Sequence, residues 1–306
     1  MQRIAGILPL ALLLCISTKV TQAQLCEPGP DNSYYPMEVT TPRVYFYLQG
    51  YYREAYLGKT TIQEREWDMI TQEYSNGLLD TVYFRREGSN IITMDSTDQE
   101  IFIRCPLEPI PGQSWRSEKM NYTYTVLDTT SSLSTPFCDY THLMQIQHRI
   151  YIGGDSITFR YFYKKGIGYV GMLDDQGILS SFLVPDTVLA TRPARKSFCD
   201  AADYDEAMAC TYRFLFSTVA EKLSDNSKVF EKELKSADPS IALIVLMDFD
   251  SSGRIQGLTP LQSNKVMRKT EKKILAYLQD AGTYLPAENA NGEPQQFYML
   301  MYFSYQ

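Results

Sequence analysis

Between residues 34 and 190, short runs rich in Val, Ile, Thr, Tyr and Phe alternate with turn-forming segments rich in Gly, Asn, Asp and Ser. Apolar and β-branched runs bounded by turn residues in this way indicate strands joined by hairpins. The 23 Tyr and 14 Phe favour the same class, because aromatic side chains suit the half-buried face of a sheet. We therefore predict an antiparallel β-rich domain over residues 24–190, with its clearest strands at Arg43–Leu48, Thr81–Arg85, Glu100–Arg104, Met144–Ile152 and Ser156–Tyr163.

The pattern changes after residue 190. Residues 191–200 are polar and contain a proline, which is typical of a linker. Beyond them, apolar residues recur at the spacing of one helix face, and Asp200 or Asp203 is placed to cap the first turn. These apolar residues are Met208, Tyr212, Leu215, Val219 and Leu223.

The remainder of residues 201–306 predicts a small α+β domain. Its expected elements are a short helix, a strand, a turn, a returning strand, a second helix and a last strand, and their order suits helices packed on one face of an antiparallel sheet. In that order they cover Lys228–Ser236, Ile241–Met247, Asp248–Gly253, Arg254–Leu258, Ser263–Gln279 and Phe297–Tyr305.

The first 23 residues have the three-part pattern of a secretory signal. Arg3 precedes an apolar core over Ile4–Ile16, and Thr21-Gln22-Ala23 offers small residues to signal peptidase. We expect cleavage after Ala23, because the alternative, an uncleaved anchor, needs an apolar run of roughly 20 residues. The expected location is the periplasm or the cell surface, without lipidation, since Cys15 and Cys26 both follow leucine and not a small residue.

The net charge limits the classes of binding partner. Cleavage removes Arg3 and Lys19 from the 29 basic residues and none of the 36 acidic ones, which leaves a mature net charge of −9. A surface of this sign repels nucleic acid, whose binding depends on basic contacts to phosphate. No later segment is long and apolar enough to be a spanning helix, and the oligomeric state stays open.

Five cysteines follow the signal segment, namely Cys26, Cys105, Cys138, Cys199 and Cys210. Export places them where disulfides form, and their odd number leaves at least one unpaired. Cys199 and Cys210 are the best local pair, because they flank the start of a predicted helix. The alternative is that these two are small buried residues without a bond.

The C-terminal part carries motifs of a known family. In residues 205–306 an apolar strand leads into Asp-Phe-Asp-Ser-Ser-Gly at Asp248–Gly253, and Tyr-Leu-Pro-Ala at Tyr284–Ala287 precedes an Asn-Gly-Glu-Pro turn at Asn291–Pro294. Their order resembles the C-terminal domain of TonB and its relatives. The resemblance implies an α+β fold and an envelope or outer-membrane protein partner, held by strand pairing. Energy transduction does not follow, because the uncleaved anchor and long proline-rich span of TonB-type transducers are missing from this sequence.

Residues 34–190 resemble a β-rich domain of exported Bacteroidota proteins with no known function. The matching segments are Tyr34–Met37, Pro106–Leu107, Pro111–Trp115, Thr135–Cys138 and Tyr163–Val170. The resemblance implies a β-rich fold and an exported location, and it implies no activity.

Gly154-Asp155-Ser156-Ile157 spells the nucleophile block of the Gly-Asp-Ser-Leu hydrolases. A serine nucleophile needs a base, which in that family is a downstream histidine. The two histidines here, His142 and His148, both precede Ser156, so we interpret the block as a hairpin turn and predict no catalytic residue.

We likewise predict no metal and no cofactor. Asp248, Asp250 and Ser252 fit the start of a calcium loop, but Thr259 stands where the bidentate glutamate belongs. His142 and His148 lack a clear third ligand for zinc. Basic residues crowd one predicted helix, where they either meet an acidic partner or form a solvated face: Lys265, Arg268, Lys269, Lys272 and Lys273.

Five Asp-Ser/Thr pairs are similar to acceptor sites for O-glycosylation in Bacteroidota; they begin at Asp80, Asp95, Asp128, Asp155 and Asp186.

Taken together, the sequence favours a non-enzymatic exported envelope protein that binds a protein or another envelope component. The first alternative is a carrier that holds a lipid or glycan in a curved β domain. The second and less favoured alternative is a serine hydrolase with Ser156 as its nucleophile.

Overall fold

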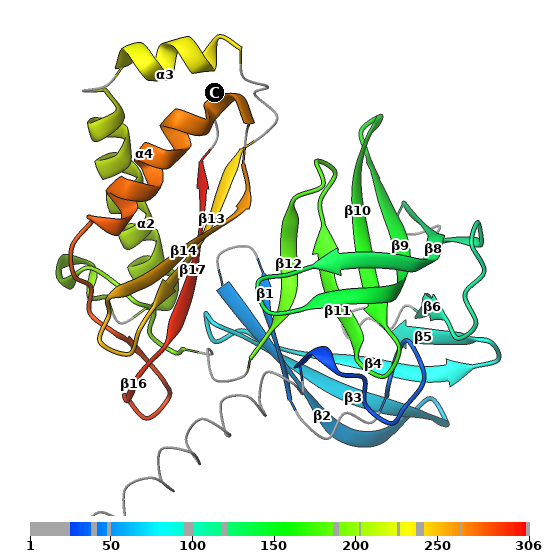
Figure 1. The fold of residues 1–306 in the computed structure, drawn as a ribbon. Helices are drawn as coiled ribbons and strands as arrows, with labels where there is room; N and C mark the ends of the chain where they lie inside the picture. The colour runs from blue at the N-terminus through cyan, green and yellow to red at the C-terminus, as the bar shows by residue number, and fades with distance from the viewer. Residues whose placement is uncertain are drawn as a thin grey trace, which may run out of the picture.

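The computed structural model describes residues 25–37, 42–47, 50–94, 101–117, 121–185, 190–201, 203–224, 227–236, 242–263 and 265–303. Most of these residues belong to antiparallel strands. A large curved sheet forms one part of the molecule, and a small sheet with helices on its outer side forms the other (Figure 1).

The large sheet has twelve strands in the order β6-β5-β4-β3-β2-β1-β12-β11-β10-β9-β8-β7. Consecutive strands pair within β1–β6 and within β7–β12, and β1 also pairs with β12, so two meanders meet in the middle of the sheet. The strands are β1 (Arg43–Tyr47), β2 (Gly50–Ile62), β3 (Arg65–Tyr74), β4 (Leu79–Glu87), β5 (Asn90–Met94), β6 (Ile101–Pro106), β7 (Ser114–Ser117), β8 (Tyr122–Ser134), β9 (Asp139–Ile152), β10 (Asp155–Lys164), β11 (Gly168–Leu173) and β12 (Leu179–Val184).

This sheet curls until its two outer strands approach each other (Figure 1). The outer strands, β6 and β7, are consecutive in the sequence. The Trp115 indole Nε1 on β7 donates a hydrogen bond to the Ile103 carbonyl on β6 at 2.9 Å. We call this near-closed structure the rolled sheet. The right-handed twist of strands favours such curling, because a sheet of this many strands does not stay flat.

Side chains from opposite sides of the rolled sheet meet in its interior. One buried cluster joins Ile70 and Phe84 from β3 and β4 with Tyr124, Ile146 and other residues of β8 to β10. The segment before β1 enters the same cluster through Tyr34 and Met37. The Tyr-Tyr-Pro-Met motif noted in the sequence therefore contributes directly to the interior.

The C-terminal part contains a three-stranded antiparallel sheet in the order β14-β13-β17. Helices α2 and α4 lie on the side of this sheet that faces away from the rolled sheet (Figure 1). The elements are α2 (Tyr204–Ser224), α3 (Ser227–Leu234), β13 (Leu243–Phe249), β14 (Ile255–Gln262), α4 (Arg268–Gln279), β15 (Ala287–Glu288), β16 (Pro294–Gln295) and β17 (Phe297–Phe303).

Helix α2 begins at a predicted cap, whereas α4 begins later than predicted. Asp203, one of the two candidate caps, accepts a hydrogen bond from the Glu206 N–H at 2.9 Å at the start of α2. The second helix was expected from residue 263 but begins at Arg268. A short 3-10 helix at Lys265–Met267 precedes α4, and β14 continues four residues beyond its expected end, to Gln262, which pairs with Ile244 of β13.

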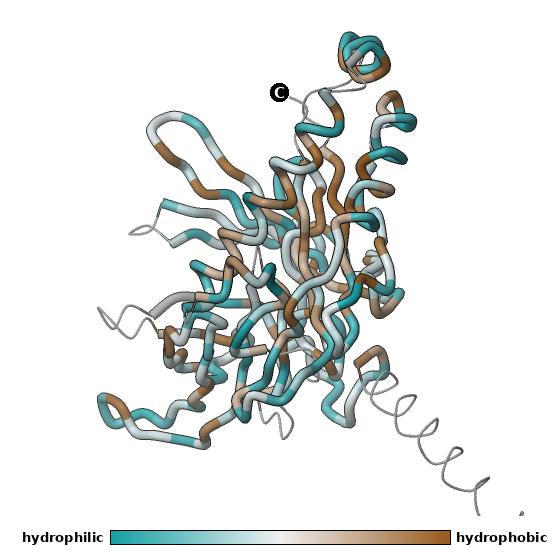
Figure 2. Tube along the Cα trace, turned by 90° about the vertical axis from the view of Figure 1, so that its left-hand side faces the viewer, coloured by the Kyte–Doolittle hydropathy of each residue, from teal (hydrophilic) through white to brown (hydrophobic). Residues whose placement is uncertain are grey.

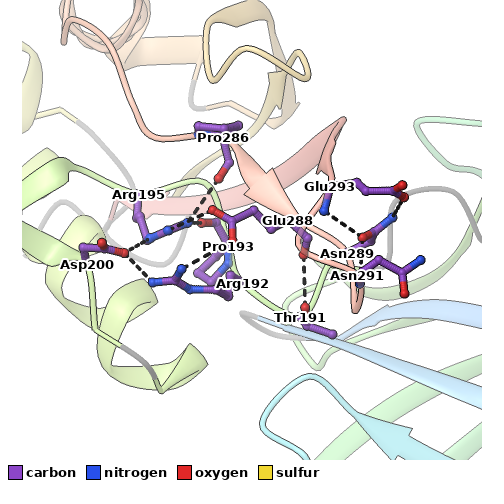
Figure 3. Close-up of polar contacts among 10 residues, drawn as sticks. All are labelled: Thr191, Arg192, Pro193, Arg195, Asp200, Pro286, Glu288, Asn289, Asn291 and Glu293. Carbon is purple, nitrogen blue, oxygen red and sulfur yellow. Dashed lines mark hydrogen bonds and ion pairs between the residues drawn. The ribbon is translucent and has the colours of Figure 1, made fainter.

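Residues 191–200, expected to be a linker, are built into the C-terminal part. Arg195 is only 2% exposed. Its guanidinium donates to Asp200 at 2.6 Å, to Glu288 at 3.1 Å and to two backbone carbonyls, and Arg192 reaches the same two carboxylates (Figure 3). A buried guanidinium needs this number of hydrogen-bond and ion-pair partners. These contacts fix residues 191–200 to the C-terminal part.

The rolled sheet and the C-terminal part share one hydrophobic core. Val44 and Phe46 of β1 and Phe182 of β12 belong to the same buried cluster as residues of β13, β17, α2 and α4. The Tyr51 side chain on β2 also bonds to the backbone of β17. Its hydroxyl donates to the Tyr298 carbonyl at 2.5 Å and accepts from the Tyr298 N–H at 3.2 Å. The two parts are therefore docked by apolar burial and by a paired polar contact.

The described residues contain two disulfides. Cys199 and Cys210, the expected pair, are joined, and so are Cys26 and Cys138, which are 112 residues apart. Cys105 is buried and free. Two disulfides in one chain are typical of proteins that fold outside the reducing cytoplasm, and they indicate an extracytoplasmic protein.

Hydrophobic and hydrophilic residues are interspersed along both parts of the chain (Figure 2). Among the helices that the structure describes, none combines the length and the apolar character needed to cross a membrane.

We predict that Tyr51→Phe lowers the free energy of unfolding by about 1–3 kcal/mol, because it leaves the buried N–H and carbonyl of Tyr298 without their partner. Urea unfolding followed by circular dichroism measures the change. Tyr302→Phe is the matched control, since it removes a hydroxyl from a 41% exposed side chain of the same strand. Equal effects of the two substitutions would contradict the assigned role of Tyr51.

Candidate functional site

The interior of the rolled sheet contains a cavity of about 410 Å³, here called the main cavity. It is lined by Tyr47, Tyr52, Gln72, Tyr74, Arg104, Ile150, Phe159, Tyr161, Tyr169, Met172 and Ser181. A small cavity of about 40 Å³ adjoins it, sharing Tyr52, Gln72, Arg104 and Tyr169 and adding Tyr35, Pro36, Arg43, Tyr45, Glu54, Ile70 and Gly168. The larger volume lies in the range of small-molecule sites in proteins.

The alternation of side chains along each strand produces this lining. Tyr45 and Tyr47 lie two residues apart on β1, and Tyr52 and Glu54 do so on β2. Residues at every second position share one face of a strand. The alternate residues point outward, and Phe46 and Tyr51 are among those that reach the C-terminal part.

Arg104 owes its position to a β-bulge in β6. Ile91 of β5 pairs with Cys105, but the next residue, Ile92, pairs with Ile103, so Arg104 is the extra residue. Bulges re-aim side chains and recur next to functional sites. Here the bulge brings a guanidinium to the wall of both cavities.

The Arg104 guanidinium is incompletely satisfied. Its Nε is buried and has no hydrogen-bond partner within the described ranges. Its guanidinium carbon lies 5.9 Å from the centre of the Tyr161 ring, which is within cation–π range. The cavity wall therefore carries a guanidinium that the described protein groups satisfy only in part.

Gly168 makes room for a second cation at the small cavity. Its φ is +94°, and a β-carbon at this position would lie 2.9 Å from Nη1 of Arg43. Only glycine suits both the backbone conformation and this close approach. The Gly-Ile-Gly-Tyr-Val motif of the sequence thereby positions Arg43 beside Tyr45 and Glu54.

Glu54 is the carboxylate of this site. Burial raises the pKa of Glu54, and a hydrogen bond from Gln72 Nε2 at 2.8 Å together with the charges of Arg43 and Arg104 opposes that rise. Glu54 retains some accessible surface although protein surrounds it, so that surface faces the cavity. Its charge is partly compensated by these neighbours.

The tyrosines of the cavity keep their protons. Burial raises the pKa of Tyr161 to about 12, against the opposing charge of Arg104. Burial also raises the pKa of Tyr52 and of Tyr169 well above the ordinary value. Each therefore presents a neutral ring and a hydroxyl that both donates and accepts.

His148 sits in an aromatic cage beside the main cavity. It is 8% exposed, stacks on Tyr124 at 4.4 Å between ring centres and lies near Tyr122, Phe159 and Tyr161. Neither ring nitrogen has a hydrogen-bond partner in the described part of the chain. Burial, with a smaller contribution from the charge of Arg104, lowers the pKa of His148 to about 4.

Ser156 lies at an exposed hairpin end. The turn between β9 and β10 uses Gly153 and Gly154 at φ of +57° and +103°, and Ser156 follows among exposed residues. His148 pairs with Phe159 further along these strands and is buried. The structure does not bring the serine and a histidine together.

The aspartates of the calcium-like segment serve separate purposes. Asp250 Oδ1 accepts hydrogen bonds from the N–H groups of Ser252 and Arg254, which closes the turn between β13 and β14. Asp248 instead accepts a hydrogen bond from Gln296. Among the described residues, no group of three or more His, Cys, Asp or Glu side chains is arranged to hold a metal ion.

Of the five Asp-Ser/Thr pairs, those at Asp95 and Asp186 lie outside the described residues. Asp80 and Asp128 accept hydrogen bonds from the backbone that follows them, and Asp155 is exposed at the β9–β10 hairpin. The basic residues of α4 are mostly exposed, as a solvated helix face would be.

Both edges of the small C-terminal sheet carry obstacles to strand pairing. On β17, Tyr51 occupies the N–H and carbonyl of Tyr298, and the Tyr212 hydroxyl of α2 occupies those of Tyr302 at 3.1 and 2.9 Å. On β14, Pro260 lacks the N–H that a partner strand requires. Edge protection of this kind is how proteins limit strand addition.

Sequence reasoning did not single out the residues of the cavity. Tyrosines at alternate positions, such as Tyr45 with Tyr47 and Tyr161 with Tyr163, were an available signal for one aromatic sheet face. Arg104 carried none, because its position depends on the bulge.

Comparisons with known proteins add little to this geometry. No protein-family model and no curated protein matches the sequence, so the likeness to the TonB C-terminal domain stays a prediction. Among solved structures, a protein from Bacteroides fragilis described as exported and as having a YmcC-like fold matches with 11% identity and a TM-score of 0.30. The match covers 51% of this chain and 95% of that one. Similarity this low carries no argument about fold or function.

We predict that His148 makes the protein sensitive to acid. The pKa of His148 in the folded state is lowered to about 4. Below about pH 6.5 the unfolded chain therefore binds a proton at this residue that the folded chain does not bind. The free energy of unfolding therefore falls as pH drops from 6.5 toward 4, by at most roughly 3 kcal/mol from this group. His148→Phe should lose less stability than the wild type between pH 7 and pH 4.5 in urea titrations.

The control is His142→Asn, which removes the other, exposed histidine. It should retain the wild-type pH dependence. Identical pH dependence of His148→Phe and the wild type would refute the buried, neutral state assigned to His148.

Proposed function

We propose that this protein is a non-enzymatic extracytoplasmic binding protein that holds a small molecule inside the rolled sheet. The observation that carries the proposal is the main cavity of about 410 Å³, with aromatic walls and a few convergent polar groups. Such a combination is typical of ligand sites, where apolar surface supplies affinity and polar groups fix orientation. Its location is the periplasm or the cell surface, as the signal segment predicts.

The lining supports reversible binding rather than catalysis. Tyr52, Tyr161 and Tyr169 stay protonated, and His148 is neutral above about pH 4. Groups so far from their titration range are poor proton-transfer catalysts at neutral pH. They are well suited to stacking and hydrogen bonding.

Binding of an envelope or outer-membrane protein, which the sequence favoured, has less support. Strand addition to the C-terminal sheet would have to displace Tyr51 or Tyr212 from β17, or pair with Pro260 on β14. The TonB-like interpretation of this part therefore supplies a fold expectation and no open docking edge.

A neutral aromatic fluorophore, N-phenyl-1-naphthylamine, tests the proposed site. The wild type should show saturable fluorescence enhancement, because the dye leaves water for the cavity. Ile150→Trp fills part of the main cavity and should weaken binding by about tenfold or more. Titration of each variant with the dye gives the dissociation constants.

Arg149→Trp is the matched control, since this exposed neighbour on β9 points to the opposite face. It should bind the dye as the wild type does. Non-saturable enhancement, or equal weakening in the two tryptophan variants, would argue against binding in the interior.

A further inference from the structure

We propose that the ligand of the main cavity is a ring compound with one anionic group, a carboxylate or a phosphate, which Arg104 binds. This inference rests on the proposed function and adds the chemical class of the ligand. Its basis is the position of Arg104 at the wall of both cavities, with a guanidinium that the described protein groups satisfy only in part.

A buried guanidinium without a full set of partners is costly unless a ligand completes it. Arg195 of the same chain illustrates the satisfied state, with two carboxylates and two carbonyls around it. Arg104 has aromatic neighbours instead: it shares a hydrogen bond with Tyr124 and lies over the Tyr161 ring, and its Nε is buried without a partner in the described ranges. Arginine binds carboxylate and phosphate through paired, charge-assisted hydrogen bonds, so an anion would supply what is missing.

The charges around the cavity favour an anion. The charges of Arg43 and Arg104 both act on Glu54, whose Oε1 accepts the hydrogen bond from Gln72. One carboxylate thus faces two guanidinium groups, which leaves positive charge at the junction of the small and main cavities. Electrostatic attraction is stronger there than in bulk water, because protein of low dielectric constant surrounds the junction.

The walls specify the rest of the ligand. Tyr52, Tyr161 and Tyr169 offer ring faces for stacking and hydroxyls for hydrogen bonds, and Gln72 and Ser181 add polar groups. A flexible aliphatic chain would leave these hydroxyls unmatched, whereas a flat ring with polar substituents would satisfy them. The volume accommodates one such molecule.

Isothermal titration calorimetry at pH 7 with 1-naphthoate and 1-naphthamide tests the inference. The two compounds share a ring system and nearly the same size, and only the first is charged. The wild type should bind 1-naphthoate about tenfold more tightly than 1-naphthamide, since a charge-assisted hydrogen bond contributes an energy of that order. Adding 1-naphthyl phosphate shows which anionic group the site prefers, and a preference for either one supports the proposal.

Arg104→Gln should abolish the preference, so that 1-naphthoate loses about tenfold more affinity than 1-naphthamide does. Arg53→Gln is the matched control, because it removes the same charge from a 41% exposed side chain on the outer face of β2. Glu54→Gln is a second, independent variant. It should tighten 1-naphthoate binding selectively, since the competing carboxylate is gone.

The experiments distinguish failure of the anionic assignment from failure of the proposed function. Equal affinity of the wild type for 1-naphthoate and 1-naphthamide overturns the anionic assignment while binding of N-phenyl-1-naphthylamine preserves the proposed function. A preference that survives in Arg104→Gln, or a loss of 1-naphthoate affinity in Glu54→Gln, also overturns it. Failure of the neutral dye to bind overturns the proposed function itself.

Discussion

The width of a twelve-stranded sheet that almost closes on itself is the constraint on which the rest of the structure depends. The interior of a closed sheet grows with strand number, and about eight strands already leave just enough room for side chains to fill it. Twelve strands need large residues to span the excess, and tyrosine supplies length with a polar tip. The aromatic composition and the residual cavity therefore have the same origin.

The outer face of the same sheet has a different task. Val44, Phe46 and Phe182 face the C-terminal part and complete its core. Tyr51 and Tyr212 occupy the outward backbone groups of β17 from two directions, one from the rolled sheet and one from α2. The Tyr51 contact thus both docks the two parts and protects the edge strand, beside the hydrophobic cluster that they share.

Much of the secondary structure could be predicted from the sequence, because alternating β-type runs and helical spacing are local signals. The Cys199–Cys210 disulfide was predictable for the same reason, whereas Cys26 and Cys138 are brought together only by folding. Residues 191–200 looked like a linker, since a polar stretch gives no sign that Arg195 will be buried among carboxylates. Arg104 stayed hidden because a bulge, set by strand pairing, determines where it points.

The pairing of β1 with β12 has an implication for how this architecture can vary. The chain enters and leaves the rolled sheet on neighbouring strands, and the polypeptide between them completes a full circuit. Such proximity of entry and exit is what permits a folded module to be inserted or fused elsewhere without disturbing its neighbours. The circuit of strands can therefore be exchanged or elaborated at its hairpins, while the surface of β1, β2 and β12 that meets the C-terminal part stays constant.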